Sequence, residues 1–149
     1  MADLFPTVAL PDPQLPDTAT EETVFGRNVA LNYENEEFFL SPTGRQYKLD
    51  AVNSWVEWCV KALSTPRYKH LIYSDNYGSE LYTLIGQSYS HEFAESEIRR
   101  MVKECLLADD RTANVDNFQF EWIDDGVMFT CRVVNIRGES RYVGGKVVL

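Results

Sequence analysis

The period of the apolar residues changes from helical to strand-like between residues 92 and 149. In residues 92–108 the apolar side chains recur at steps of three and four, which places them on one face of a helix: Ala94, Ile98, Met101, Val102 and Cys105. Acidic residues concentrate in the first turns of this segment and basic residues in later turns, as the helix dipole favours. From Phe118 onward, apolar residues alternate with polar ones, as in a strand with one buried face. One long helix followed by alternating strands predicts an α+β fold.

The alternating region is predicted to form a three-strand meander. The first strand carries Phe118, Phe120 and Trp122 on one face, and the second carries Val127, Phe129, Cys131 and Val133. Asp125-Gly126 between them is a strong hairpin signal. Arg137-Gly138 marks a second turn before a last strand at residues 140–149, which Gly144-Gly145 is expected to kink or bulge.

A second helix and a short hairpin are predicted upstream. Five apolar residues recur at helical spacing: Val52, Trp55, Val56, Cys59 and Leu63. Asp50 is expected to cap this helix, and Pro66 disfavours helical geometry at Thr65 and so ends it. Between residues 24 and 50, two short apolar runs flank turn formers at residues 41–44, which favours a hairpin or two short strands. Together these elements predict two main helices packed on a small antiparallel sheet.

Residues 1–23 are expected to form an extended N-terminal arm in front of a single α+β domain at residues 24–149. The arm contains four prolines, which favour an extended or polyproline-like backbone. Its apolar residues could dock on a partner, and we single out Phe5, Leu10 and Leu15 as candidate contacts. A frayed terminus is the alternative, and the sequence does not distinguish the two.

The composition argues against several classes of function. The formal charge is −9, from 23 acidic and 14 basic residues, and such a field repels nucleic-acid phosphates and anionic membranes. No stretch approaches the ~20 apolar residues of a membrane-spanning helix, and the N-terminus lacks the basic start of a secretion signal. We therefore expect a protein that stays in the cytosol, without nucleic-acid or membrane partners.

No pattern of a catalytic, metal or cofactor site stands out. Cys59, Cys105 and Cys131 are an odd number without a close pair, and His70 and His91 lack the spacing of metal ligands. The eight glycines form no phosphate-binding loop, and neither histidine lies in a nucleophile motif. We expect no catalytic residue, no metal, no cofactor and no small-molecule substrate.

A carboxylate pair is the catalytic alternative, because glycosidases need only two acids across a sugar cleft and no sequence spacing reveals that geometry. The candidate acids are Glu80, Glu95, Glu97, Asp109 and Asp110. Against this interpretation, Glu95 and Glu97 fall on the solvated face of the predicted helix. The two aspartates at its end could instead hold Arg111 or face a cationic partner surface.

A succession of short motifs runs through residues 44–111. In order they are Gly44-x-x-Tyr47-Lys48, Arg67-Tyr68, Leu71-Ile72-Tyr73, Tyr77-Gly78, Glu80-Leu81, Leu84-Ile85-Gly86 and Asp110-Arg111. This order resembles the XkdS-like family of contractile-tail baseplate proteins over roughly residues 41–134. The tract from Thr65 to Gly86 is the most specific part. The wider superfamily was labelled lysozyme-like, yet its members look structural.

The resemblance implies a structural baseplate wedge subunit of a contractile tail, in a myophage, a phage-tail-like bacteriocin or a related contractile injection system, and not an enzyme. The implied partners are other baseplate wedge proteins and the tail sheath, with tube or hub proteins as further candidates. In such a joint, an edge strand provides strand addition across an interface. The last strand would then contribute Tyr142 and Val147. The subunit would assemble in the host bacterial cytoplasm and end in the tail baseplate.

Two further pairs of residues are candidate partner contacts. Tyr73 and Tyr77 lie in a tyrosine-rich segment whose rings cannot all point into one small core, although burial is the alternative. Asp110 and Arg111 match a Glu-Pro-Arg-like motif of the wider wedge pattern, but this chain lacks the proline and continues with Thr112. We expect Arg111 to tie the helix end to the sheet or to a wedge partner through charge-assisted hydrogen bonds. A small peptidoglycan glycoside hydrolase and a cytosolic acidic adaptor are the alternative functions.

Overall fold

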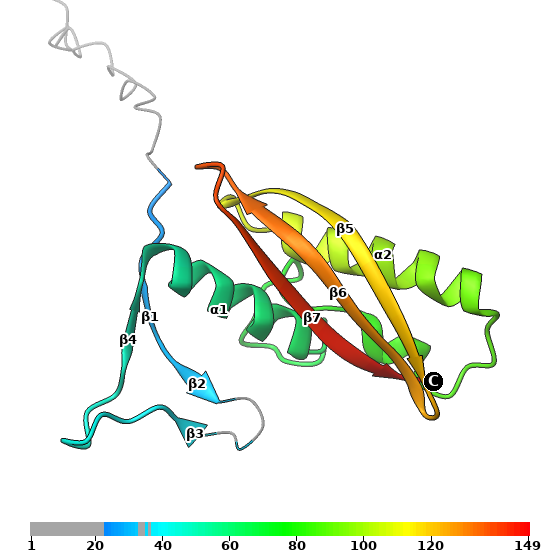
Figure 1. Ribbon diagram of the computed structural model, residues 1–149, viewed down its shortest axis with the longest axis horizontal. Helices are drawn as coiled ribbons and strands as arrows, with labels where there is room; N and C mark the ends of the chain where they lie inside the picture. The colour runs from blue at the N-terminus through cyan, green and yellow to red at the C-terminus, as the bar shows by residue number, and fades with distance from the viewer. Residues whose placement is uncertain (1–22, 33–34, 36) are drawn as a thin grey trace, which may run out of the picture.

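The computed structural model describes residues 23–32, 35 and 37–149. Two helices, α1 (Ala51–Ser64) and α2 (His91–Leu107), lie on one side of a three-stranded antiparallel sheet (Figure 1). A short 3₁₀ helix, η1 (Leu81–Leu84), lies between the two helices in sequence. The predicted α+β class is confirmed. The predicted arm contacts Phe5, Leu10 and Leu15 lie outside the described residues.

The C-terminal sheet is the predicted meander, with strand order β5-β6-β7. Its strands are β5 (Thr112–Ile123), β6 (Gly126–Asn135) and β7 (Ser140–Val148). Of the kink or bulge predicted at Gly144-Gly145, the bulge is wrong, because the pairing of β6 with β7 continues through both glycines without a shift. A Cβ at Gly144 would instead collide with the backbone carbonyl of Phe129, so close approach explains this glycine. The two register shifts of the sheet lie in β5.

The two main helices follow the predicted patterns. The predicted stripe of α2 is buried, and the Ser90 hydroxyl caps the helix by accepting a hydrogen bond from the Phe93 N–H at 3.4 Å. Helix α1 ends one residue before Thr65, whose extended backbone is the conformation that a following proline favours. The predicted cap by Asp50 is wrong. Asp50 occupies the capping position, but its carboxylate pairs with Arg27 at 3.2 Å and makes no capping bond.

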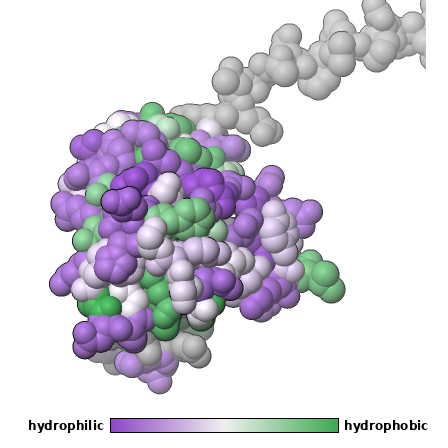
Figure 2. Space-filling view, turned by 90° about the vertical axis from the view of Figure 1, so that its right-hand side faces the viewer, coloured by the Kyte–Doolittle hydropathy of each residue, from purple (hydrophilic) through white to green (hydrophobic). Residues whose placement is uncertain are grey.

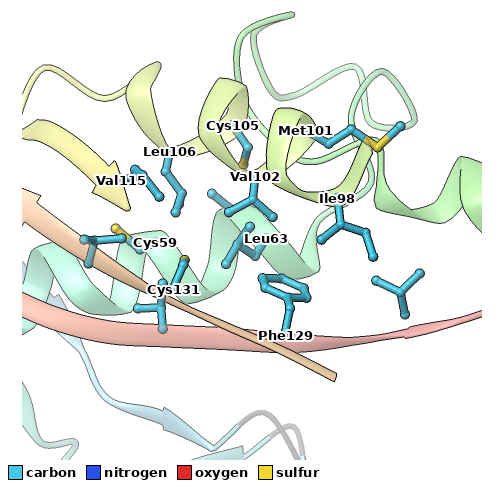
Figure 3. Packing of buried hydrophobic residues seen from close by; sticks show 14 of the residues in the cluster. Cys59, Leu63, Ile98, Met101, Val102, Cys105, Leu106, Val115, Phe129 and Cys131 are labelled. Carbon is cyan, nitrogen blue, oxygen red and sulfur yellow. The ribbon is translucent and has the colours of Figure 1, made fainter. Parts of the chain in front are cut away.

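The core lies between the helices and the inner face of the sheet. Figure 3 shows Cys59 and Leu63 of α1 facing Val102 of α2, with Phe129 and Cys131 reaching up from the sheet. The three cysteines are buried free thiols, and burial raises the pKa of each thiol to about 12. Helix α1 is also fixed to β5 by a buried hydrogen bond, in which Trp55 Nε1 donates to Thr112 Oγ1 at 2.9 Å. Helices and sheet therefore share one core.

Residues 24–50, which we call the N-terminal hairpin, form two small antiparallel ladders. They contain β1 (Arg27–Val29), β2 (Leu31–Asn32), β3 (Glu37–Phe38) and β4 (Lys48–Asp50), with β1 paired to β4 and β2 paired to β3. The predicted turn is present, and the Gly44 N–H donates to the Ser41 carbonyl at 2.8 Å. In Figure 1 the β2 and β3 end of the hairpin projects away from the helices and the sheet.

Candidate assembly interface

Strand β7 has a free edge. Within the described residues its hydrogen-bonded neighbour is β6 alone. The Leu149 N–H donates to the Asp125 carbonyl at 3.3 Å. In an antiparallel pair, every second residue of a strand forms backbone hydrogen bonds to the neighbouring strand. The odd-numbered residues of β7 therefore bond to β6. The backbone N–H and C=O groups that point to the free edge are those of Ser140, Tyr142, Gly144, Lys146 and Val148. This edge is a template for an additional strand.

The opposite edge of the sheet, β5, is less regular. Its pairing with β6 shifts register between Thr112 and Asn114 and again between Asp116 and Gln119. Asn117, inside the second shift, has a positive φ of 50°. Bulges of this kind interrupt the row of backbone donors and acceptors and twist an edge away from a partner. Strand β7 is therefore the better edge for strand addition.

A groove with a volume of about 260 Å³ runs beside β7. One wall is formed by residues 144–148 of β7, and the other by the end of α1 at Leu63 together with Leu81 and Ile85 around η1. Five consecutive residues of a strand can line one hollow only along its backbone edge, because successive side chains point to opposite faces. The groove is therefore continuous with the free edge.

The loop at residues 66–78 is held closed by Arg67. This side chain is 10% exposed; its Nε donates to the Asp75 carbonyl at 2.6 Å, and its Nη1 lies 3.0 Å from Glu104. The two ends of the loop are joined by a backbone hydrogen bond from Arg67 to Ser79 at 2.9 Å. Gly78 has a φ of +100°, and a Cβ there would collide with the Thr65 carbonyl. The loop conformation is thus fixed from inside the molecule.

The 66–78 loop presents apolar side chains to solvent. Leu71 and Ile72 are almost completely exposed. The predicted contacts Tyr73 and Tyr77 do lie together, with ring centroids 4.5 Å apart, and Tyr77 packs edge-on against Trp58 of α1 at 5.7 Å. Burial raises the pKa of the Tyr77 hydroxyl to about 12. Tyr77 therefore anchors the loop, whereas Leu71 and Ile72 form its exposed tip.

The N-terminal hairpin has an anchored root and an exposed tip. Phe25 is buried in the core, and the Leu31 N–H donates to Glu57 Oε1 of α1 at 3.2 Å. Next to Leu31 in the ladder and on toward the turn at residues 41–44, four large apolar side chains are each about half exposed, and we call them the hairpin tip: Phe38, which pairs with Leu31, and Phe39, Leu40 and Tyr47. Figure 2 shows one face of the molecule, where hydrophilic side chains dominate and hydrophobic areas are separate patches. An apolar tip on a projecting hairpin is a second surface suited to a protein partner.

Of the two aspartates that could hold Arg111, Asp109 pairs with it. Its Nη2 lies 2.6 Å from Asp109 Oδ2, and its Nη1 donates to the Phe25 carbonyl at 3.0 Å. The guanidinium also lies 5.7 Å from the ring centroid of Trp58. Asp109 reaches this position because its Oδ1 also accepts a hydrogen bond from the backbone N–H of Arg111 at 2.8 Å, and this bond turns the carboxylate toward the guanidinium. Asp110 is exposed. Arg111 thus ties the end of α2 to the hairpin root and α1, and its pKa is raised by the hydrogen bond to Asp109.

The two predicted contacts on β7 have different surroundings. Tyr142 is exposed on the outer face of the sheet, where its hydroxyl lies 3.4 Å from Asn117 Nδ2. Val147 is buried on the inner face, so only Tyr142 of the two offers its side chain to a partner.

Most of the candidate catalytic acids have structural partners. Glu95 accepts a hydrogen bond from Trp122 Nε1 at 2.9 Å, and Glu80 lies 3.5 Å from Arg67. Glu97 pairs with Arg100 at 2.8 Å, and that hydrogen bond lowers the pKa of its carboxyl. A glycosidase acid needs a raised pKa, so the shift at Glu97 has the wrong sign for that role.

No cluster of three or more histidine, cysteine or acidic side chains with metal-binding geometry occurs in residues 23–32, 35 and 37–149. Neither α1 nor α2, nor any other helix in the described part of the chain, is long and apolar enough to cross a membrane.

The sequence analysis missed the exposed tips and the groove. Leu71 and Ile72 lie among turn-forming residues, in a segment without a helical or alternating pattern. The lack of a pattern is the sequence signal that they belong to a loop. Gly144-Gly145 was assigned to a bulge, although glycine in a strand also marks a place where another backbone or ligand comes close.

Comparisons with known proteins connect these features to a family. The model of the contractile injection system sheath initiator family matches residues 27–138. The chain is also similar to the phage-like element PBSX protein XkdS of Bacillus subtilis (strain 168), at 32% identity over 92 residues. This similarity covers 53% of the chain and 65% of that protein. The family match includes most of the N-terminal hairpin, both helices and the β5–β6 pair.

Proposed function

Because the chain belongs to the contractile injection system sheath initiator family, we propose that it is a baseplate wedge subunit that joins the wedge proteins to the first ring of the tail sheath. A structural, sheath-associated role in a contractile tail follows from the family and from the similarity to a phage-like element protein. The wedge position and the contacts are the finer part of the proposal. The observation that carries it is the regular free edge of β7.

In this proposal the sheath binds by strand addition to β7. An incoming extended segment satisfies the backbone groups that point to the free edge, and each such hydrogen bond contributes roughly 0.5–1.5 kcal/mol net. Helices α1 and α2 pack against the inner face of the sheet and hold it in place. The edge is therefore rigid before the partner binds. A preformed edge lowers the ordering cost of association.

The baseplate side of the joint uses the projecting elements. The exposed tips of the N-terminal hairpin and of the 66–78 loop dock on neighbouring wedge proteins, with Tyr73 and Tyr77 supporting the loop. Residues 1–23 act as an arm on a single domain at residues 24–149, and Phe5, Leu10 and Leu15 add contacts to wedge, tube or hub proteins. Asp110 is exposed beside the Arg111 anchor and adds a charged contact there.

The proposed role is structural and not catalytic. The family is a structural component of contractile injection systems, and four of the five candidate acids engage arginine or tryptophan side chains. The subunit is proposed to assemble in the cytoplasm of the host bacterium and then to reside in the tail baseplate.

Deletion of the gene from a producer strain tests this function. Particles purified after induction should contain baseplate proteins and little or no attached sheath, as seen by negative-stain imaging and mass spectrometry. Restoration of sheathed tails by the wild-type gene on a plasmid is the control. Normal sheathed tails in the deletion strain would contradict the proposal.

A further inference from the structure

We propose that the groove beside β7 receives one aromatic side chain of the strand that pairs with this edge, and thereby fixes the register of that strand. This inference rests on the proposed function, because it names the partner segment that fits the same edge. The occupant is an extended peptide segment with an aromatic residue facing the helices and acidic residues nearby.

The position of the groove follows from the register of the sheet. Val143 and Val147 point inward from β7 and are buried, and Gly145 occupies the inward position between them. Gly145 contributes no side chain, and the Phe129 ring occupies the space beside it, since a Cβ at Gly145 would meet that ring at 3.2 Å. A residue on a neighbouring strand, one strand spacing farther out, would place its inward side chain in the groove beside Gly145. The groove is thus located where a paired strand presents a side chain.

The walls and volume of the groove suit an aromatic ring. Leu63, Leu81 and Ile85 line one side, and Phe129 also contributes to the lining (Figure 3 shows Phe129 pointing toward Leu63). The volume is about 260 Å³, whereas an apolar cavity of about 150 Å³ is sufficient to bind benzene. The groove therefore accommodates one ring with its linking carbon. Leu63, Leu81 and Ile85 would pack against the ring, and Ser64, Ser79 and Lys146 add polar groups to the lining.

The charge of β7 indicates the rest of the partner segment. The strand carries Arg141 and Lys146 and no acidic residue, in a chain with a formal charge of −9. Lys146 is paired with Asp125 at 2.9 Å, whereas the Arg141 guanidinium contacts only its neighbouring backbone carbonyl, at 2.8 Å, among the contacts of the described residues. An acidic residue on the incoming strand would pair with Arg141. Such complementarity favours the correct partner over others.

Binding of the purified sheath protein from the same particle tests the inference, with affinity measured against four variants of the full chain. Ile85→Asp places a carboxylate in the groove wall. Ile136→Asp is its matched control, because the exposed fractions of Ile85 and Ile136 are similar, at 55% and 48%, and Ile136 lies outside the groove. Tyr142→Pro removes a backbone donor at the free edge, whereas Tyr142→Ala removes only the side chain. Melting temperatures establish that each variant is folded.

The expected result is at least tenfold weaker binding for Ile85→Asp and for Tyr142→Pro, with Ile136→Asp within twofold of wild type. Weakened binding by Tyr142→Pro together with unchanged binding by Ile85→Asp would overturn the groove inference and leave strand addition standing. Unchanged binding by both would overturn the proposed function as well. If Ile85→Asp does not fold, Ile85→Ser is measured against Ile136→Ser under the same criteria.

Discussion

The body of helices and sheet and the two projecting elements use their apolar residues in opposite ways. In the body, apolar side chains from α1, α2 and the inner face of the sheet meet in one buried core. In the N-terminal hairpin and the 66–78 loop, large apolar side chains lie at the tips and are half to fully exposed. Both elements are nonetheless fixed at their roots, by Phe25 and by Arg67. We propose from this contrast that stability resides in the body and recognition in the tips and the free edge.

The largest expected effect is the loss of folding when a charge enters the body. Val102 is completely buried on α2. Val102→Asp should cost more than about 4 kcal/mol, because an unpaired carboxylate loses its hydration without gaining a partner. Leu107→Asp on the same helix, where the side chain is about half exposed, should cost about 1 kcal/mol or less. Chemical denaturation measures both, and a stable, soluble Val102→Asp protein would disprove the core assignment.

An intermediate effect is expected at the root of the 66–78 loop. Arg67→Ala removes a buried guanidinium and leaves the Asp75 carbonyl without its donor, so the free energy of unfolding should fall by about 2 kcal/mol. Arg100→Ala removes an exposed helix-surface pair and should cost less than about 0.5 kcal/mol. Urea unfolding of the two variants compares a buried anchor with a surface ion pair. Equal losses would mean that Arg67 does not hold the loop.

The smallest effect on stability is expected at the tip of the N-terminal hairpin. Replacement of Phe38 by serine should lower the free energy of unfolding by about 1 kcal/mol, because the ring is already about half exposed and loses only about half of the value of full burial. Incorporation into particles should nevertheless fall, as measured by complementation of the deletion strain. A loss of several kcal/mol in the free energy of unfolding would mean that the hairpin tip belongs to the core. Full complementation by the variant would mean that the tip is not part of the interface.

The long elements were predictable from sequence because each repeats its pattern over many residues. The stripe of α2 and the alternation from Phe118 onward each contain several independent matches to one period, and both elements are present. The partner with which a single side chain pairs was not predictable in this way. Whether Arg111 pairs with Asp109 or Asp110 depends on a turn of a few residues, and periodicity does not report it.

The groove and the closed loop depend on contacts between distant parts of the chain. The groove lies between β7 and the end of α1 with η1, and no local pattern brings these segments together. Arg67 reaches Glu104, 37 residues away, and Asp75 within its own loop, so its role as an anchor becomes visible only in the folded chain. Sequence reasoning therefore located the helices and strands but not the contacts between distant segments.

Amide hydrogen exchange of β7, measured by NMR with and without the sheath protein, tests strand addition most directly. In the free protein, the amides of Val143, Gly145 and Val147 should be protected by β6, and those of Tyr142 and Lys146 should exchange rapidly. Binding of the sheath protein should slow exchange at Tyr142 and Lys146 by at least tenfold. Rapid exchange at both positions in the bound protein would contradict the account.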